Sequence, residues 1–151
     1  MDATELARQL LGPIPAHVTL GLEVVRAADG EAEVAAEVPH ALTNVIGSLH
    51  SSGLMTLVDA AGLAALIGAV DNPDDFAGVI PLGGAAELRF LAPARGRLVA
   101  TCRLEAEERA AVKALFAGET ETARAMTEAE IRDVDGEVVC RGSFDWSLRR
   151  R

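Results

Sequence analysis

The sequence predicts an α+β protein in which an antiparallel sheet of five to six strands wraps round one long central helix. The first observation is an apolar segment from Gly53 to Val70, in which only Thr56 and Asp59 are neither apolar nor glycine. A helix without a polar face must be enclosed by other structure. The second observation is that much of the remaining chain alternates apolar and polar residues with the period of half-buried strands. A sheet that covers one helix follows from both.

Length and composition limit the possible functions. The 151 residues, 50% of them hydrophobic and 25% charged, suit one globular domain spanning residues 1–151. A net charge of −9 with scattered Lys and Arg argues against nucleic-acid or anionic-membrane binding, which needs a basic patch. Asp59 leaves the apolar run too short for a membrane span. Cys102 and Cys140 lack metal-ligand spacing and no signal peptide is evident, so we expect a cytoplasmic protein without metal or cofactor.

The N-terminal elements are a short helix and a hairpin. Asp2 or Thr4 can cap the helix, which Gly12-Pro13 ends. Two strands are then expected over residues 22–27 and 31–38, joined by a tight Asp29-Gly30 turn. Glutamates alternate with Ala and Val in the second strand, so one face of the hairpin should be buried.

Residues 40–49 are rich in turn-forming residues and should form an ordered loop that leads to the central helix. Ser51 or Ser52 is the expected N-cap of this helix. This helix should end at Asp71-Asn72-Pro73. One sheet does not cover an all-round apolar helix. We therefore expect a second subunit to complete the enclosure, as a homodimer or homotetramer with active sites at the subunit interface.

The second half of the chain predicts strands and one more helix. Alternation indicates strands over residues 86–90 and 98–105, separated by a turn at 93–96. A helix over residues 107–117 should end at Gly118. Two last strands, over residues 120–133 and 137–148, should be joined by an Asp135-Gly136 turn.

Asp59 is the first candidate for chemistry. Burying an ionised carboxylate without partners costs several kcal/mol, so this side chain should pair, change its pKa or face a cavity. It lies too far into the helix to cap its own N-terminus. One alternative is a structural carboxylate that neighbouring elements or a partner subunit satisfy. The other is a catalytic group, either a general base or a nucleophile.

The residues around this helix start resemble a known family. Asn44, Gly47 and His50, with Asp59 nine positions after His50, fit the pattern of hot-dog-fold acyl-CoA thioesterases of the phenylacetate-pathway type. The order of elements is similar across nearly the whole chain. Ser51-Ser52 replaces the Gly-Gly that follows the His in that pattern. The helix over 107–117 and the Phe144-Asp145-Trp146 ending look like those of a divergent branch.

The resemblance implies hydrolysis of an acyl-CoA thioester. Asp59 would be base or nucleophile, and backbone N–H groups at Ser51 and Ser52 would be oxyanion donors. Asn44 would either stabilise the loop or orient water or the carbonyl. His50 is more simply explained as a structural residue that holds the loop by side-chain hydrogen bonds.

Six further residues are expected to contact the substrate. Arg95 and Arg97 follow a strand-ending proline, where the resemblance implies that coenzyme A phosphates would lie, although a solvated turn is the simpler explanation for either arginine taken alone. The others are Gly47, Thr56, Gly83 and Gly84. The main alternative function is a hot-dog protein that binds or senses acyl-CoA without cleaving it, which Ser51-Ser52 favours. A hot-dog hydratase or dehydratase is a third class, but its usual His and acid arrangement is not evident.

Overall fold

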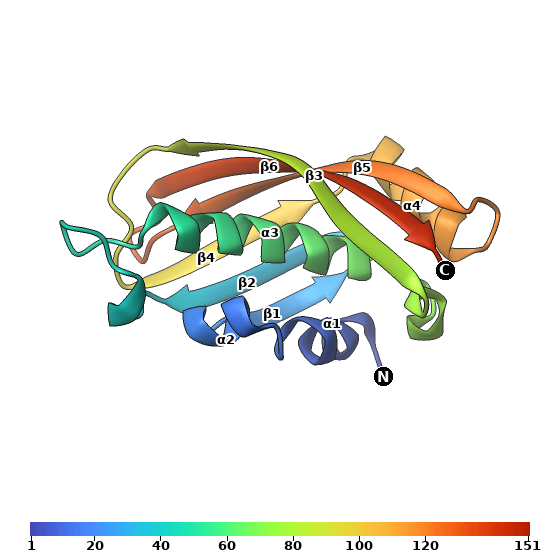
Figure 1. Ribbon diagram of the computed structural model, residues 1–151, viewed down its shortest axis with the longest axis horizontal. Coiled ribbons are helices and arrows are strands. Elements are labelled where there is room, and N and C mark those ends of the chain that lie inside the picture. The colour runs from blue at the N-terminus through green and yellow to red at the C-terminus, as the bar shows by residue number, and fades with distance from the viewer.

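The structure, a computed structural model, describes all of residues 1–151 and confirms the expected fold class (Figure 1). One six-stranded antiparallel sheet curves along the long helix α3 (Ser51–Ile67), which lies across its inner face. A cluster of 38 buried residues fills the space between them. The alternation of β2 (Glu31–Glu37) explains the inner face, because Ala32, Val34 and Ala36 are buried while the glutamates face outward.

The order of strands in the sheet differs from their order in the chain. From one edge to the other it is β1 (Glu23–Ala28), β2, β4 (Arg97–Arg103), β5 (Thr122–Arg132), β6 (Val138–Arg150) and β3 (Val79–Phe90). The turn at 93–96 therefore joins two strands that do not pair with each other. β3 pairs only with β6 and forms a long free edge.

Two glycines allow α3 to pack closely on the sheet. A Cβ at Gly142 of β6 would lie 2.9 Å from side-chain carbons of both Val58 and Leu88. A Cβ at Gly62 of α3 would clash with Oγ1 of Thr127, the hydroxyl that accepts a hydrogen bond from Trp146. Since real Cβ atoms almost never approach other atoms this closely, the helix and sheet could not keep this separation with alanine at either position.

Two short helices cover one flank of α3. The first, α1 (Ala3–Leu11), begins as expected, because the Asp2 side chain accepts a hydrogen bond of 2.8 Å from the N–H of Glu5. The second, α2 (Pro15–Leu20), packs against α3 and was not expected from the sequence. Its six residues are too few to show a period, although Pro15 suits a first helical position.

Three expected boundaries were wrong. His50, and not Ser51 or Ser52, is the N-cap of α3, and the helix ends at Ile67, before a short turn η2 (Pro73–Phe76). β3 begins at Val79 and not at 86, because most of this edge strand is exposed and shows no alternation. The remaining elements, η1 (His40–Leu42) and α4 (Ala106–Phe116), lie in the expected loop and helix.

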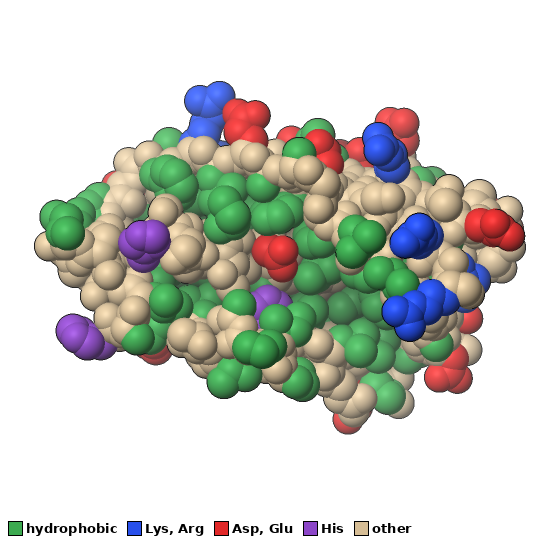
Figure 2. Space-filling model, viewed as in Figure 1, with side chains coloured by type: hydrophobic (Ala, Val, Ile, Leu, Met, Phe, Trp, Pro, Cys, Tyr) green, Lys and Arg blue, Asp and Glu red, His purple; other side chains and the backbone are tan.

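One stripe of α3 remains uncovered in the single chain. Its members recur at helical spacing, Ser52, Met55, Thr56, Asp59 and Leu63, and all are exposed or half-buried. Figure 2 shows hydrophobic side chains gathered on this face, with acidic and histidine side chains among them. Met55 is 45% exposed, and Leu82 and Phe90 of the neighbouring β3 are 52% and 57% exposed. In length and hydropathy, every helix falls short of what a bilayer span requires.

Candidate active site

The loop before α3 is held by the side chain of Asn44. Its Oδ1 accepts hydrogen bonds from the N–H groups of Ile46, at 3.1 Å, and Ser48, at 3.0 Å. Its Nδ2 donates to Ser48 Oγ at 2.8 Å. Gly47 adopts the left-handed φ of 74° that this turn requires. Both ends of the amide are thus engaged within the loop, which favours a stabilising role for Asn44 over contact with a substrate.

His50 caps the helix that this loop delivers. Its Nδ1 accepts a hydrogen bond from the N–H of Ser52 at 3.1 Å and lies 2.8 Å from Ser52 Oγ. Because a backbone N–H can only donate, Nδ1 is the acceptor in this cap. The N–H of Ser51 has no partner in the chain. Of the two expected oxyanion donors, Ser51 is therefore free and Ser52 is already used by the cap.

Asp59 lies about two turns beyond Ser52 on the uncovered stripe, and is half-buried rather than enclosed in the single chain. Burial raises the pKa of its carboxyl, while the charge of His17 on α2 lowers that pKa. No hydrogen bond contributes to this pKa. An unpartnered carboxylate with a raised pKa at an apolar surface is a suitable proton acceptor.

His17 is a candidate residue that the sequence did not reveal. It is 3% exposed, and its Nδ1 lies 2.7 Å from the carbonyl oxygen of Leu11. No spacing signal relates it to Asp59, since their proximity depends on α2, a helix that was itself not expected. The only local feature of the sequence near His17 is Pro15, two residues earlier, which suits the start of a helix.

The other expected substrate contacts lie at several places. Thr56 Oγ1 donates to the carbonyl of Ser52 at 2.9 Å, within its own helix. Gly83 and Gly84 lie at an irregularity of the exposed β3, and a Cβ at Gly83 would be in ordinary contact with the ring of Phe144. Thr56 is thus on the uncovered stripe, and Gly83 and Gly84 are on the edge strand.

The two arginines have different partners. Arg95 Nη2 donates to the carbonyl of Ile46 at 2.8 Å, which ties the turn after β3 to the loop before α3. Arg97 Nη2 lies 3.0 Å from Glu23 Oε2 of β1. Arg95 is therefore beside the helix start, whereas the guanidinium of Arg97 is directed to the opposite edge of the sheet.

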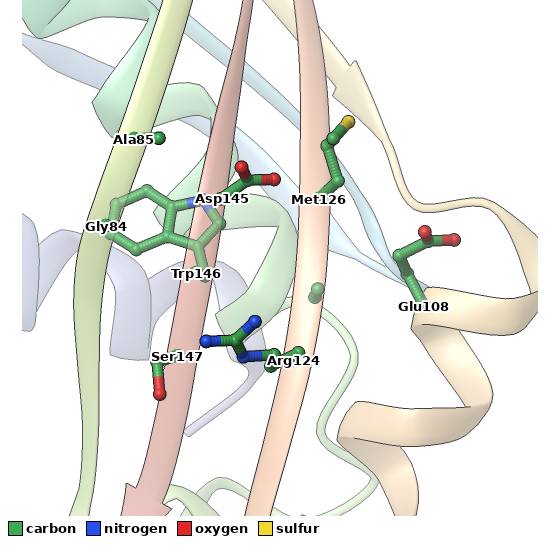
Figure 3. Close-up of a pocket in the computed structure, with 9 residues that line it drawn as sticks. Gly84, Ala85, Glu108, Arg124, Met126, Asp145, Trp146 and Ser147 are labelled. Atoms are coloured by element: carbon green, nitrogen blue, oxygen red, sulfur yellow. The ribbon is translucent and has the colours of Figure 1, made fainter.

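Two hollows of the chain lie away from Asp59. One of about 470 Å³ lies on the outer face of the sheet, and Figure 3 shows Arg124 and Asp145 there on neighbouring strands, with Glu108 of α4 beside them. Another of about 560 Å³ lies further along the same face. Their rims are charged and open, and of the expected site residues only Gly84 touches either hollow.

Known proteins share this architecture. A protein of unknown function from Pseudomonas aeruginosa, described as a probable thioesterase, is 31% identical, with a TM-score of 0.76 over 98% of this chain and 96% of that one. The PaaI protein of the Escherichia coli phenylacetic acid degradation operon is 19% identical, with a TM-score of 0.72 over 99% and 93%. PaaI from Thermus thermophilus, solved as a mutant, is 21% identical, with a TM-score of 0.66 over 89% and 98%.

No curated protein matches the sequence. The model of one family does match, over residues 5–148, and that family is described as a domain of unknown function, DUF4442. The match covers α1 to β6, including the N-terminal helices that carry His17. The chain therefore belongs to the DUF4442 family, and it has the hot-dog fold that the PaaI structures share.

Proposed function

We propose that the protein is an acyl-CoA thioesterase that hydrolyses a thioester to a free acid and coenzyme A. The observation that carries this proposal is Asp59, an unpartnered carboxylate on the uncovered stripe of an otherwise apolar helix. The free N–H of Ser51 supports it, since an amide at a helix N-terminus can stabilise a developing oxyanion. The similarity to a probable thioesterase is consistent with the same chemistry.

In the reaction, water attacks the thioester carbonyl while Asp59 accepts one of its protons. The carbonyl oxygen gains negative charge, which the Ser51 N–H and the positive end of α3 stabilise. Collapse of this intermediate breaks the C–S bond, and the coenzyme A thiolate takes the proton from Asp59. A direct attack by the Asp59 carboxylate, followed by hydrolysis of the resulting anhydride, is the alternative route.

Helix geometry favours a site that two chains share. Ser51 and Asp59 are eight residues apart on α3, and a rise of 1.5 Å per residue separates them by about 12 Å along the axis. A reacting carbonyl must lie about 3 Å from both the oxyanion donor and the attacking group. When Asp59 is itself the attacking group, one chain cannot meet both demands, so we propose that the amide of one subunit and the carboxylate of another serve the same thioester.

The free edge of β3 supports a homodimer, or a homotetramer built from such dimers. An unpaired edge beside exposed apolar side chains is unstable in a monomer unless something covers it. A second copy that covers β3 and the stripe of α3 encloses Asp59 and brings its own Ser51 to the pocket.

Arg95 is the better placed of the two arginines to hold the coenzyme A phosphates. It is exposed beside the loop that leads to Ser51, and its present partner is a single carbonyl. Arg97 is a weaker candidate because it already pairs with Glu23. A coenzyme A thioester as substrate also agrees with a cytoplasmic location.

A second function has one observation in its favour. The N–H of Ser52 is committed to His50, which leaves one oxyanion donor at the helix start where two were expected. A protein that binds or senses acyl-CoA without cleaving it needs no oxyanion donor. Free thiol release from a panel of aliphatic and aryl acyl-CoAs separates the two functions, because a sensor binds members of the panel and releases no thiol from any of them.

A further inference from the structure

The sheet has two edge strands, and their backbones differ in what they contact. The strand order places β1 at one edge and β3 at the other. Helix α1 lies alongside β1 (Figure 1). β3 pairs with β6 on one side and is free on the other. Since an unpaired strand edge can pair with a strand of another chain, the contacts at β1 bear on how copies of this chain associate.

Thr4 of α1 contacts Ala27 of β1 in the way that a neighbouring strand would. Its hydroxyl Oγ1 donates to the carbonyl of Ala27 at 3.0 Å and accepts the N–H of Ala27, also at 3.0 Å. In an antiparallel ladder, a directly opposed residue on the next strand exchanges these same two hydrogen bonds. One threonine hydroxyl therefore satisfies both backbone groups of Ala27, and no strand can pair there while α1 is in place.

Arg8 of α1 holds the next part of the same edge. Its Nε donates to the carbonyl of Val24 at 3.0 Å, and its Nη2 donates to the carbonyl of Val25 at 3.2 Å. The pairing of β1 with β2 shifts register between Val24 and Arg26, so Val25 is an extra residue in the ladder. Such a bulge on an edge strand already disfavours further pairing. The guanidinium adds to this effect by occupying two carbonyls of the edge.

These polar contacts are not what anchors α1 in the fold. Thr4 and Arg8 are one helical turn apart and share the face of α1 that meets β1. Ala7 and Leu11, also one turn apart, are 0% and 3% exposed and belong to the core. Their burial holds the helix by apolar contact. The hydrogen bonds to β1 therefore have a separate effect, which is to occupy the strand edge.

We propose that α1 blocks strand pairing at β1, so that copies of this chain associate by strand pairing through the β3 edge alone. A molecule with two open strand edges can add copies at both, and such an association does not close. With β1 occupied, one open edge remains, and pairing through it stops at two sheets. The occupant that α1 excludes is a second copy of this chain, which brings its own free strand edge along the twelve residues of β3.

The test removes the polar contacts and keeps the helix. Thr4→Val has nearly the same shape and loses both bonds to Ala27, while Arg8→Met keeps an apolar stem and loses both bonds to β1. The double variant Thr4→Val/Arg8→Met therefore frees the edge. The control Gln9→Met/Thr19→Val makes the same kinds of change at exposed positions, where the Thr19 hydroxyl bonds within its own helix. Circular dichroism and thermal melts establish that each variant folds.

The first measurement is hydrogen exchange at the Ala27 amide, followed by NMR at low protein concentration so that new association does not protect it. We expect exchange about tenfold or more faster in the double variant than in the wild type and the control, because the hydroxyl that accepts this N–H is gone. Unchanged exchange contradicts the occupation of this edge by α1. Thr4→Val alone should show the same acceleration, and it serves for both measurements if the double variant does not fold.

The second measurement is sedimentation velocity over a range of concentrations. The double variant should form species of at least about twice the wild-type mass that grow with concentration, whereas the control keeps the wild-type mass. A folded double variant with a fast Ala27 amide and the wild-type mass overturns the proposal. Larger species in the control also overturn it, because added apolar surface then explains the association. Neither measurement uses a substrate, so absence of thiol release contradicts only the proposed function.

Discussion

His50 Nδ1 accepts a hydrogen bond of 3.1 Å from the backbone N–H of Ser52, which makes the imidazole the N-cap of α3. Loss of such a cap costs about 1 kcal/mol, and Asn is among the best capping residues. We expect His50→Ala to lower the free energy of unfolding by about 1 kcal/mol and His50→Asn to restore most of it, as measured by urea unfolding. Equal losses in both variants contradict the capping role.

Gly142 of β6 lies against Val58 of α3. A Cβ there would be 2.9 Å from carbons of Val58 and Leu88, so Gly142→Ala should lower the free energy of unfolding by about 1–3 kcal/mol, the usual cost of overpacking. Gly84→Ala is the control, because the nearest atom to its Cβ is 3.8 Å away. Similar effects at the two glycines in thermal melts argue against the close packing described here.

The free edge of β3 predicts assembly. Sedimentation at micromolar concentration should show no monomer for the wild type. Leu82→Lys places a charge on this exposed apolar edge and should produce monomers, whereas Val134→Lys, in an exposed turn outside the sheet, should not. A folded wild-type monomer contradicts both the assembly and the shared site.

Arg95 and Arg97 predict a difference between substrates. A charge-assisted contact with a phosphate contributes about 1.5–3 kcal/mol. Replacing both arginines with Gln should therefore raise KM for acyl-CoA far more than for a short acyl thioester that lacks the nucleotide. Arg95→Gln alone should give most of this effect. Equal changes for both substrates refute phosphate binding by either side chain.

The raised pKa of Asp59 has a consequence for stability. The folded protein holds this proton to higher pH than the unfolded chain, whose Asp titrates near 3.9, so the contribution of Asp59 to stability falls as pH rises through that interval. Asp59→Asn removes the titration. The free energy of unfolding of Asp59→Asn, relative to the wild type, should increase from pH 3 to pH 7 in urea titrations. A constant difference shows that burial does not raise this pKa.

Most of the fold could be predicted from the sequence, because local patterns of apolar and polar residues indicate its helices and strands. The alternation of β2 and the apolar run of α3 depend on side chains that face one core, and periodicity reports that directly. β3 could not be delimited, since exposed residues have no reason to alternate. β3 pairs with β6, which is distant in the sequence, and not with the strand that follows the 93–96 turn. The residues of that turn do not show which strand is the partner.

The candidate site could be predicted only in part. Asp59 was identified because a carboxylate in an apolar helix is costly wherever that helix packs. The approach of His17 depends on how α2 packs on α3, a tertiary contact with no signature in spacing. The cap at His50 displaced the expected Ser51 or Ser52 because an imidazole nitrogen can accept the N–H that a serine hydroxyl usually takes.

Thiol release by Asp59→Asn tests the central claim most directly. Asn has nearly the shape of Asp and cannot accept a proton, so the fold, the assembly and acyl-CoA binding should persist. Turnover should fall by about 100-fold or more, the contribution expected of a general base. Asp145→Asn, at an exposed carboxylate on the outer face, should release thiol at the wild-type rate. Wild-type turnover by a folded Asp59→Asn protein would show that Asp59 is structural and contradict the mechanism.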